Sequence, residues 1–542
     1  MRDSGAAGLE TLVLGIDGAC RAVLDPLFDT GATPTIERLV ESGVTGPLES
    51  QIPPWTASAW PSLFTGMNPG KHGVFGFLAF DGYDWDVVDG SHVRERSLWE
   101  ILDRHGLTSV VVNVPTTSPP RPFDGALVPG YLAPDEPTCH PEGLFEDVRD
   151  AVGEYCVYPS HTGEEGVPRS QQLAELRRLS TMRGEAFRYL LDRFDPDFGF
   201  LQFQQTDSVF HDFGGDMDAA QQVYEAVDAE IARTLDHADP ETVFVVSDHG
   251  LGPYGGHEFR VNEHLRTAGQ VSTTRGGDGM PSWSVIRNGR LAGDGTESQG
   301  LGERVISGLS RVGLTSQRIG SALARVGLDE FVLRHVPQSY VRAGTERVDF
   351  AASRAFMRSR VELGVRLNVA GREPDGVVHP EEYDSVREEV MATLRAVETP
   401  DGKPVFERVA PREAIFEGPH LEEAADVIVV PREFDEFLSA QLGRGPFGPP
   451  SEPWNHKLDG IVAVNGRKAP NRAGFEGASL FDVAPTVLST FGVPLDDRMD
   501  GRVLPGFENP GTSEYPAFDP AAATAGTDDT VEARLADLGY IE

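Results

Sequence analysis

The chain has 542 residues, of which 39% are hydrophobic, so it can bury a sizeable core and is not a disordered protein. Its formal net charge of −38 at pH 7 repels nucleic acids and anionic membrane surfaces, which excludes a general polyanion-binding protein. The cysteines, Cys20, Cys139 and Cys156, include no CxxC pair, which argues against a disulfide framework and a thiolate zinc site.

The charged residues also indicate where the protein works. The basic residues are nearly all arginine, because the only lysines are Lys71, Lys403, Lys457 and Lys468. High acid content with little lysine suits solubility in concentrated salt, and we expect a halophilic cytoplasm rather than an ordinary acidic protein. The N-terminal apolar run is short and ends in Asp17, so it predicts a strand and not a signal peptide. No run approaches the roughly 18 apolar residues of a membrane span, so a cytoplasmic protein is expected.

The first half of the chain alternates predicted strands and helices. Thr56 follows a Pro-rich turn and suits the start of a helix, and Ser97 with Glu100 has the spacing of a capping box. The stretch 119–168 is rich in Pro and Gly and predicts loops around one short helix. The pattern predicts an α/β fold with a mostly parallel central sheet flanked by helices. Strands are predicted at 11–16, 108–114, 198–203 and from 242, and helices at 35–42, 98–105, 144–152, 170–194 and 219–237.

The second half predicts an inserted cap region and a return to the core. The sequence becomes Gly- and Ser-rich after about 269, with short helices predicted at 303–312 and 318–326. Sheet-like sequence returns near 366–369. It is followed by a predicted helix at 380–397, a strand at 425–430, a closing helix at 480–488 and a short tail helix at 531–538. The expected organisation is a catalytic core in two parts, 9–268 and 348–510, with an insertion or cap at 269–347 and an acidic tail at 511–542.

Side chains of the kinds that bind metals follow or precede several predicted strands. In open parallel sheets, ligands gather outside the carboxyl ends of the strands. Asp207 and His211 are four residues apart and share a face if they lie on one helical turn. Mixed Asp and His ligands suit zinc or a similar divalent ion. With Thr56 added, the candidates form two ligand sets: Asp17, Thr56, Asp248 and His249 in one, and Asp207, His211 and His456 in the other.

Two such sites predict a specific chemistry. Two metals roughly 4 Å apart can clamp the attacking and leaving oxygens of an in-line displacement. A metal also lowers the pKa of a hydroxyl, which is what Thr56 needs to act as a nucleophile. Ordinary interpretations stay open for single residues: Thr56 and Asp17 as helix N-caps, Asp248 as a turn residue, and His211 as a packed histidine. Their joint placement at strand ends favours the metal sites.

These residues, in this order, resemble the metal motifs of the alkaline-phosphatase superfamily, most closely its type I phosphodiesterase/nucleotide pyrophosphatase family. The stretches 368–376 and 484–501 are similar to a narrower prokaryotic group of predicted phosphohydrolases or phosphomutases. The resemblance covers about 10 to 505 of the chain. The motifs that carry it are Gly15-Ile16-Asp17-Gly18, Thr56 with Thr65-Gly66, Pro69 and His72-Gly73, Thr206-Asp207 with His211, Ser247-Asp248-His249-Gly250, and His456 with Asp459-Gly460.

The resemblance implies two divalent metals, with zinc expected and manganese or magnesium as alternatives, and a covalent phosphothreonine at Thr56. The first ligand set would hold the metal that activates Thr56, and the second the metal that activates the hydrolytic water. The family's asparagine after the nucleophile has no counterpart here, since Ala57, Ser58 and Ala59 follow Thr56, and no basic residue stands beside Thr56. Residues that could bind the substrate instead are Lys71, His72, Asn113, Arg372 and Lys457.

The function expected on this basis is a metal-dependent phosphodiesterase or related phosphohydrolase acting on a small phosphoester, nucleotide- or sugar-linked. A phosphomutase is the alternative within the superfamily, and it needs a closing domain that excludes water. A sulfatase is disfavoured because position 56 is threonine. A metal-stabilised binding protein without catalysis is the third hypothesis, which a Thr56 variant separates from the others.

Overall fold

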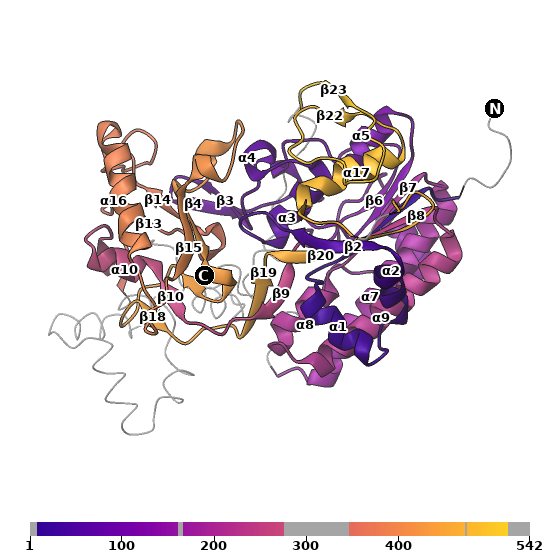
Figure 1. Cartoon of the computed structure of the whole chain (residues 1–542), viewed down its shortest axis with the longest axis horizontal. Coiled ribbons are helices and arrows are strands. Elements are labelled where there is room, and N and C mark those ends of the chain that lie inside the picture. The colour runs from indigo at the N-terminus through magenta and orange to yellow at the C-terminus, as the bar shows by residue number, and fades with distance from the viewer. Residues whose placement is uncertain (1–7, 161–165, 276–345, 472–473, 519–542) are drawn as a thin grey trace, which may run out of the picture.

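The computed structural model describes residues 8–160, 166–275, 346–471 and 474–518, and its centre is an eight-stranded sheet with the order β21-β2-β20-β8-β1-β7-β5-β6 (Figure 1). Strand β20 runs antiparallel to both of its neighbours, and all other neighbouring pairs are parallel. The prediction of a mostly parallel sheet is therefore confirmed. The strands are β1 (Thr11–Ile16), β2 (Val44–Glu49), β5 (Ser109–Val112), β6 (Gly125–Val128), β7 (Phe198–Phe203), β8 (Thr242–Val246), β20 (Asp459–Gly466) and β21 (Ala478–Ser479).

Helices cover both faces of this sheet because its strands are apolar on both sides. On β1, Leu12 and Leu14 belong to one hydrophobic core, and Val13 between them belongs to the other. One face is covered by α1 (Arg21–Asp29), α2 (Pro34–Ser42), α6 (Leu144–Val152), α7 (Arg169–Phe194), α8 (Gln205–Phe213) and α9 (Met217–Ala238), and the opposite face by α3 (Thr56–Thr65), α5 (Leu98–Arg104) and α17 (Val483–Thr490) (Figure 1).

Most predicted elements match the observed ones within a few residues, and the capping box of Ser97 and Glu100 is present at the start of α5. The region 119–168 was predicted as loops around one helix, but it also contributes β6 to the edge of the sheet. A four-residue strand is too short to show a periodicity. Among the described helices, none combines the length and apolar character that a bilayer crossing requires.

Part of the predicted insertion, 276–345, and the tail from 519 lie outside the described residues, together with the helices predicted at 303–312, 318–326 and 531–538. The division of the chain into core, cap and tail stays a prediction.

The segment that follows the predicted insertion builds a second, antiparallel sheet with the order β13-β14-β16-β15. Its strands are β13 (Ala355–Phe356), β14 (Gly364–Leu367), β15 (Phe406–Pro411) and β16 (Val427–Pro431), and it packs against α16 (Tyr383–Arg395). Smaller elements complete the fold: α4 (Pro69–His72), α10 (Val261–Thr267), β3 (Leu78–Asp81), β4 (Asp84–Val87), β10 (Glu258–Arg260), β11 (Thr273–Arg275), β12 (Glu346–Val348), β17 (Phe437–Ser439), β18 (Phe447–Gly448), β22 (Leu495–Asp496) and β23 (Thr512–Ser513).

A buried carboxylate, Asp426, holds this second sheet together. Both of its oxygens accept hydrogen bonds from the Arg372 guanidinium at 2.7 Å, and Tyr383 Oη donates to it at 2.9 Å. The Leu367 backbone N–H at the end of β14 donates to it at 2.7 Å. Burial by itself raises the pKa of Asp426, but the bonds and charge of Arg372, with the charge of Arg366 and the Leu367 N–H, more than offset this and lower the pKa to about 2.

We expect Asp426→Ala to lower the free energy of unfolding by about 3–5 kcal/mol, because it removes a buried charge partner from both Arg372 and Arg412 and, among the described residues, leaves Arg372 paired with the carboxylate of Glu373 alone, at 2.9 Å. In the wild type, this contribution is complete above the ordinary carboxyl pKa of 3.8 and is lost as the pH falls through about 2. Urea unfolding at pH 7 and pH 3 measures both effects. Equal stability of the variant and the wild type at pH 7 would contradict the assignment.

A two-stranded ribbon connects the parallel sheet to the late part of the chain. It pairs β9 (Gly250–Pro253) with β19 (Trp454–Lys457) (Figure 1). In the register of this pair, His456 lies opposite Leu251. The indole of Trp454 stacks on Phe210 of α8, with ring centroids 5.3 Å apart and planes 20° apart. The sequence predicts His456 just before a strand, and β20 does begin at Asp459, but the short strand β19 that contains His456 was not predicted. This pairing places His456 beside residues that are some 200 positions earlier in the chain.

Candidate functional site

The predicted metal ligands lie at the carboxyl ends of three neighbouring strands. β8, β1 and β7 are adjacent in the sheet, and Asp248, Asp17 and Asp207 each follow one of them within a few residues. Thr56 is the first residue of α3, so it lies at the positive end of the helix dipole. The fold therefore brings together residues from four separate segments.

The first predicted ligand set forms a tight, fully buried cluster around one imidazole nitrogen. His249 Nε2 lies 3.5 Å from Asp17 Oδ1, 3.3 Å from Asp248 Oδ2 and 3.3 Å from Thr56 Oγ1. All of these side chains are inaccessible to solvent. Asp17, Asp248 and His249 offer three ligand atoms within 4.8 Å of one another, which is a spacing that a metal ion can bridge.

The second predicted set forms a similar cluster beside the first. Asp207 Oδ1 lies 3.4 Å from His211 Nε2 and 3.5 Å from His456 Nε2, and the two imidazole nitrogens are 3.1 Å apart. The rings of His249 and His456 stack with centroids 3.6 Å apart, so the two clusters are in direct contact. All members of both predicted sets are thus brought together.

The hydrogen bonds of two histidines direct one ring nitrogen of each toward the clusters. His249 Nδ1 lies 3.0 Å from the Gly250 carbonyl oxygen, and His456 Nδ1 lies 2.7 Å from the Pro54 carbonyl oxygen. A carbonyl oxygen only accepts, so Nδ1 carries the proton and donates it. The lone pair of Nε2 then faces the cluster, as a metal ligand requires. His211 Nδ1 likewise lies on the side of a carboxylate, 3.8 Å from Glu452 Oε2.

The carboxylates of the site fit a cation. Asp17 Oδ1, Asp207 Oδ1 and Asp248 Oδ2 are buried and accept no hydrogen bond from the described part of the chain. Burial raises the pKa values of Asp17 and Asp248, and the neighbouring carboxylates raise them further. Burial also raises the pKa of Asp207, but His211 and His456 offset it and bring that pKa well below its ordinary value. Bare buried oxygens of three carboxylates are costly unless a metal compensates them, and mixed Asp and His donors suit a divalent ion.

Of the predicted substrate-binding residues, four are tied to groups outside these clusters. Lys71 Nζ bonds Asp500 and the Arg498 carbonyl oxygen, His72 Nε2 lies 2.9 Å from Ser62 Oγ, Arg372 binds Asp426, and Lys457 Nζ lies 2.9 Å from Asp435 Oδ1.

The fifth predicted substrate-binding residue, Asn113, lies closer to the metal ligands, because its amide donates to Gln202, which in turn donates to Asp17. The role of all five in substrate binding stays a prediction.

Three residues that hold the carboxylate ligands were not predicted. Trp60 Nε1 and Gln202 Nε2 donate to Asp17 Oδ2 at 3.0 and 2.8 Å, and Gln204 Nε2 donates to Asp207 Oδ2 at 3.3 Å. A signal existed for Gln202, since it is an amide inside a strand that is buried along its whole length. Such a side chain needs a partner.

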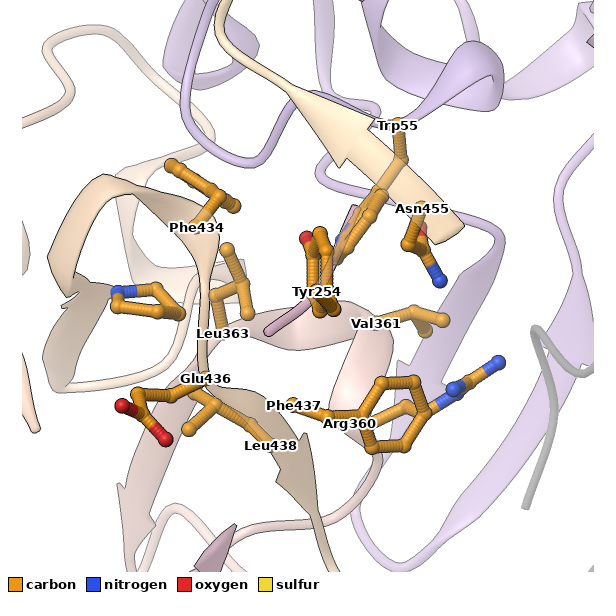
Figure 2. Close-up of a pocket in the computed structure, with 11 residues that line it drawn as sticks. Trp55, Tyr254, Arg360, Val361, Leu363, Phe434, Glu436, Phe437, Leu438 and Asn455 are labelled. Atoms are coloured by element: carbon orange, nitrogen blue, oxygen red, sulfur yellow. The ribbon is translucent and has the colours of Figure 1, made fainter. Parts of the chain in front are cut away.

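A pocket adjoins the clusters on the side of the second sheet. Figure 2 shows aromatic and aliphatic side chains around it, together with the polar side chains of Arg360, Glu436 and Asn455. The Trp55 ring packs against His456, with centroids 5.1 Å apart. The pocket residues Trp55 and Asn455 directly precede Thr56 and His456 in the chain.

Many solved structures have a similar fold. Phosphonoacetate hydrolase from Sinorhizobium meliloti 1021, in complex with phosphonoformate, aligns with a TM-score of 0.52 at 18% sequence identity, covering 88% of this chain and 94% of that chain. Wild-type alkaline phosphatase PafA aligns with a TM-score of 0.53 at 13% identity, covering 93% and 100%. At these identities the likeness shows the fold alone, which agrees with the α/β fold expected from the sequence. A comparison with curated protein sequences found no match.

A family model described as type I phosphodiesterase / nucleotide pyrophosphatase matches residues 11–303, more than half of the chain. The matched range contains Asp17, Thr56 and Asp248, and the ribbon of β9 and β19 adds His456 from outside it. This match confirms the resemblance found in the sequence motifs. The chain therefore belongs to the type I phosphodiesterase / nucleotide pyrophosphatase family and is a phosphoric ester hydrolase.

Proposed function

We propose that this protein is a divalent-metal-dependent phosphodiesterase or related phosphohydrolase that acts through a covalent phosphothreonine at a two-metal site. The observation that carries the proposal is the position of Thr56. Its hydroxyl lies 3.3 Å from His249 Nε2, at the N-terminus of α3 and beside carboxylate oxygens that lack hydrogen-bond partners in the described residues. A threonine that acted only as a helix cap would need no such surroundings.

The ligand sets follow from the two clusters. Asp17, Asp248 and His249, with the Thr56 oxygen, would hold one ion, and Asp207, His211 and His456 would hold the other. The donor set suits zinc, with manganese or magnesium as alternatives. Divalent ions at these positions would supply positive charge that lowers the pKa of a bound hydroxyl and neutralises phosphoryl oxygens.

Thr56 would act in two steps. Its Oγ1 forms a bond to phosphorus while the bond from phosphorus to the leaving oxygen breaks, and water then cleaves the phosphothreonine and restores the hydroxyl. The backbone N–H groups at the start of α3 would hold the non-bridging oxygens of the phosphoryl group. They would thereby replace the basic residue that is absent beside Thr56.

The pocket in Figure 2 would receive a part of the substrate beyond the phosphoryl group. The Trp55 Nε1–H is buried and has no hydrogen-bond partner among the residues that the structure describes. An unpaired buried donor is costly, and an acceptor atom of a small phosphoester would pair with it.

A hydrolysis assay tests the proposal. The chelated, metal-free protein and the protein reconstituted with zinc or manganese are compared in high salt, on bis-(p-nitrophenyl) phosphate and p-nitrophenyl phosphate. We expect the diester to be hydrolysed only by the reconstituted protein. A preference for the monoester would favour a phosphatase or phosphomutase. If the protein bound metals but hydrolysed neither ester, phosphohydrolase activity on these ester classes would be contradicted.

A further inference from the structure

We propose that Asn113, Gln202 and Gln204 form an amide ladder that orients the carboxylates of both metal sites and couples the two sites. The inference rests on the proposed two-metal function, and it assigns these residues as positioning residues that touch neither substrate nor metal. It also gives Asn113 a role different from the substrate contact predicted from the sequence.

The ladder is a continuous chain of hydrogen bonds. Asn113 Nδ2 donates to Gln202 Oε1 at 2.7 Å and to the Gln202 carbonyl oxygen at 3.1 Å. Gln202 Nε2 donates to Asp17 Oδ2 at 2.8 Å and to Gln204 Oε1 at 3.3 Å. Gln204 Nε2 donates to Asp207 Oδ2 at 3.3 Å. One branch therefore ends on a carboxylate of the first cluster and the other on a carboxylate of the second.

The chemistry of the end groups fixes the direction of every bond. A carboxylate only accepts, so the amide nitrogens of Gln202 and Gln204 must face Asp17 and Asp207. The Gln202 oxygen is then left to accept from Asn113. All three amides are buried, so water does not compete for these bonds.

The ladder leaves one oxygen of each carboxylate for a metal. It occupies Oδ2 of Asp17 and Oδ2 of Asp207, and the Oδ1 atoms of both are those without a hydrogen-bond partner in the described residues. Because both carboxylates are held through Gln202, a rotation of its amide would disturb both ends of the ladder together. This is the basis of the proposed coupling between the two sites.

The packing of β1 makes room for this arrangement. Gly15 lies opposite Gln202 in the register of β1 and β7. A Cβ atom at Gly15 would lie 2.6 Å from the Trp60 ring and 3.1 Å from Gln202 Cγ. Trp60 is the second donor to Asp17 Oδ2, at 3.0 Å. The absence of a side chain at this position thus allows both donors to reach the same carboxylate oxygen.

Metal titration of the metal-free protein tests the ladder without relying on turnover. Zinc binding is followed by calorimetry, and cobalt binding by its visible absorption, which reports ligand geometry. Gln202→Met and Gln204→Met remove the amides and keep the side-chain length. We expect Gln202→Met to weaken both binding steps, and Gln204→Met mainly one of them, by about 10- to 100-fold, with altered cobalt spectra.

Two further variants complete the experiment. Asn113→Asp creates no cavity, and aspartate tolerates the positive φ of 65° at this position. It places an acceptor opposite Gln202 Oε1, which favours rotation of the Gln202 amide by a half turn. We therefore expect weaker metal binding in this variant too. Gln270→Met is the matched control, since Gln270 is equally buried but bonds Glu389 in another part of the fold. It should bind both ions like the wild type.

The outcomes separate the ladder from the proposed function. Two ions bound by the wild type and bound equally well by all three ladder variants, with unchanged cobalt spectra, would overturn the ladder and leave the two-metal site intact. A wild type that binds no pair of ions would overturn the two-metal function on which the ladder rests.

Discussion

Asp248→Ala is expected to lose metal from the cluster around Thr56 and to lose hydrolysis with it. The variant removes a fully buried carboxylate whose Oδ2 lies 3.3 Å from His249 Nε2. Changes to residues that only orient a ligand cost about 10- to 100-fold in metal affinity, so the loss of a ligand should exceed about 100-fold. Metal analysis after gel filtration should find one ion fewer per chain, and the rate should fall to the level of the chelated protein.

The matched control is Asp228→Ala. Asp228 is also a buried carboxylate, but it accepts hydrogen bonds from the backbone N–H groups of Thr35 and Ile36 at the start of α2. Its loss should reduce stability by about 0.5–2 kcal/mol, as for other helix caps, and leave the metal content unchanged. Full metal occupancy in Asp248→Ala would refute the ligand assignment.

Thr56→Ala is expected to abolish turnover while both metals stay bound. The variant removes one oxygen and leaves Asp17, Asp248 and His249 in place. Loss of a covalent nucleophile should lower kcat by at least about 10⁴-fold, with little effect on the free energy of unfolding. Steady-state kinetics on bis-(p-nitrophenyl) phosphate and metal analysis of the same preparation measure both parts of this prediction.

Thr56→Ser shows whether the hydroxyl itself is responsible. It keeps the hydroxyl and removes a methyl group, so it should retain turnover far above that of Thr56→Ala. If Thr56→Ala kept the wild-type rate, water would be the direct nucleophile and Thr56 would be an ordinary helix residue. If the variant lost its metals together with its activity, Thr56 would be shown to be an essential ligand, and its nucleophilic role would need separate evidence.

Three adjacent strands of the parallel core could be predicted from the sequence because they are short apolar runs with acidic residues soon after them. The runs ending at Ile16, Phe203 and Val246 became β1, β7 and β8, side by side in the sheet. β2 and β6 were missed, because β2 is interrupted by Gly46 and Pro47 and the four residues of β6 are too few to show a periodicity. His456 was predicted as a ligand, but its neighbours follow from the pairing of β9 with β19, which no local pattern indicates.

The candidate site, like the fold, could be predicted only in part. Ligands that follow strands could be found from their residue types and positions, and the structure brings all of them together. The residues that hold them could not, because the bond from Gln202 to Asp17 joins positions far apart in the chain. The pairing of Arg372 with Asp426 could not be predicted for the same reason, although both terminal nitrogens of the guanidinium bind this carboxylate. A charged side chain in a sequence does not show which opposite charge it meets.

The stereochemistry of hydrolysis tests the central claim most directly. A chiral phosphorothioate diester is hydrolysed by the metal-loaded protein in isotopically labelled water, and the configuration at phosphorus is determined in the product. Attack by Thr56 followed by attack by water inverts the phosphorus twice, so we predict net retention. Net inversion would mean a single direct attack by water and would contradict the covalent phosphothreonine at Thr56.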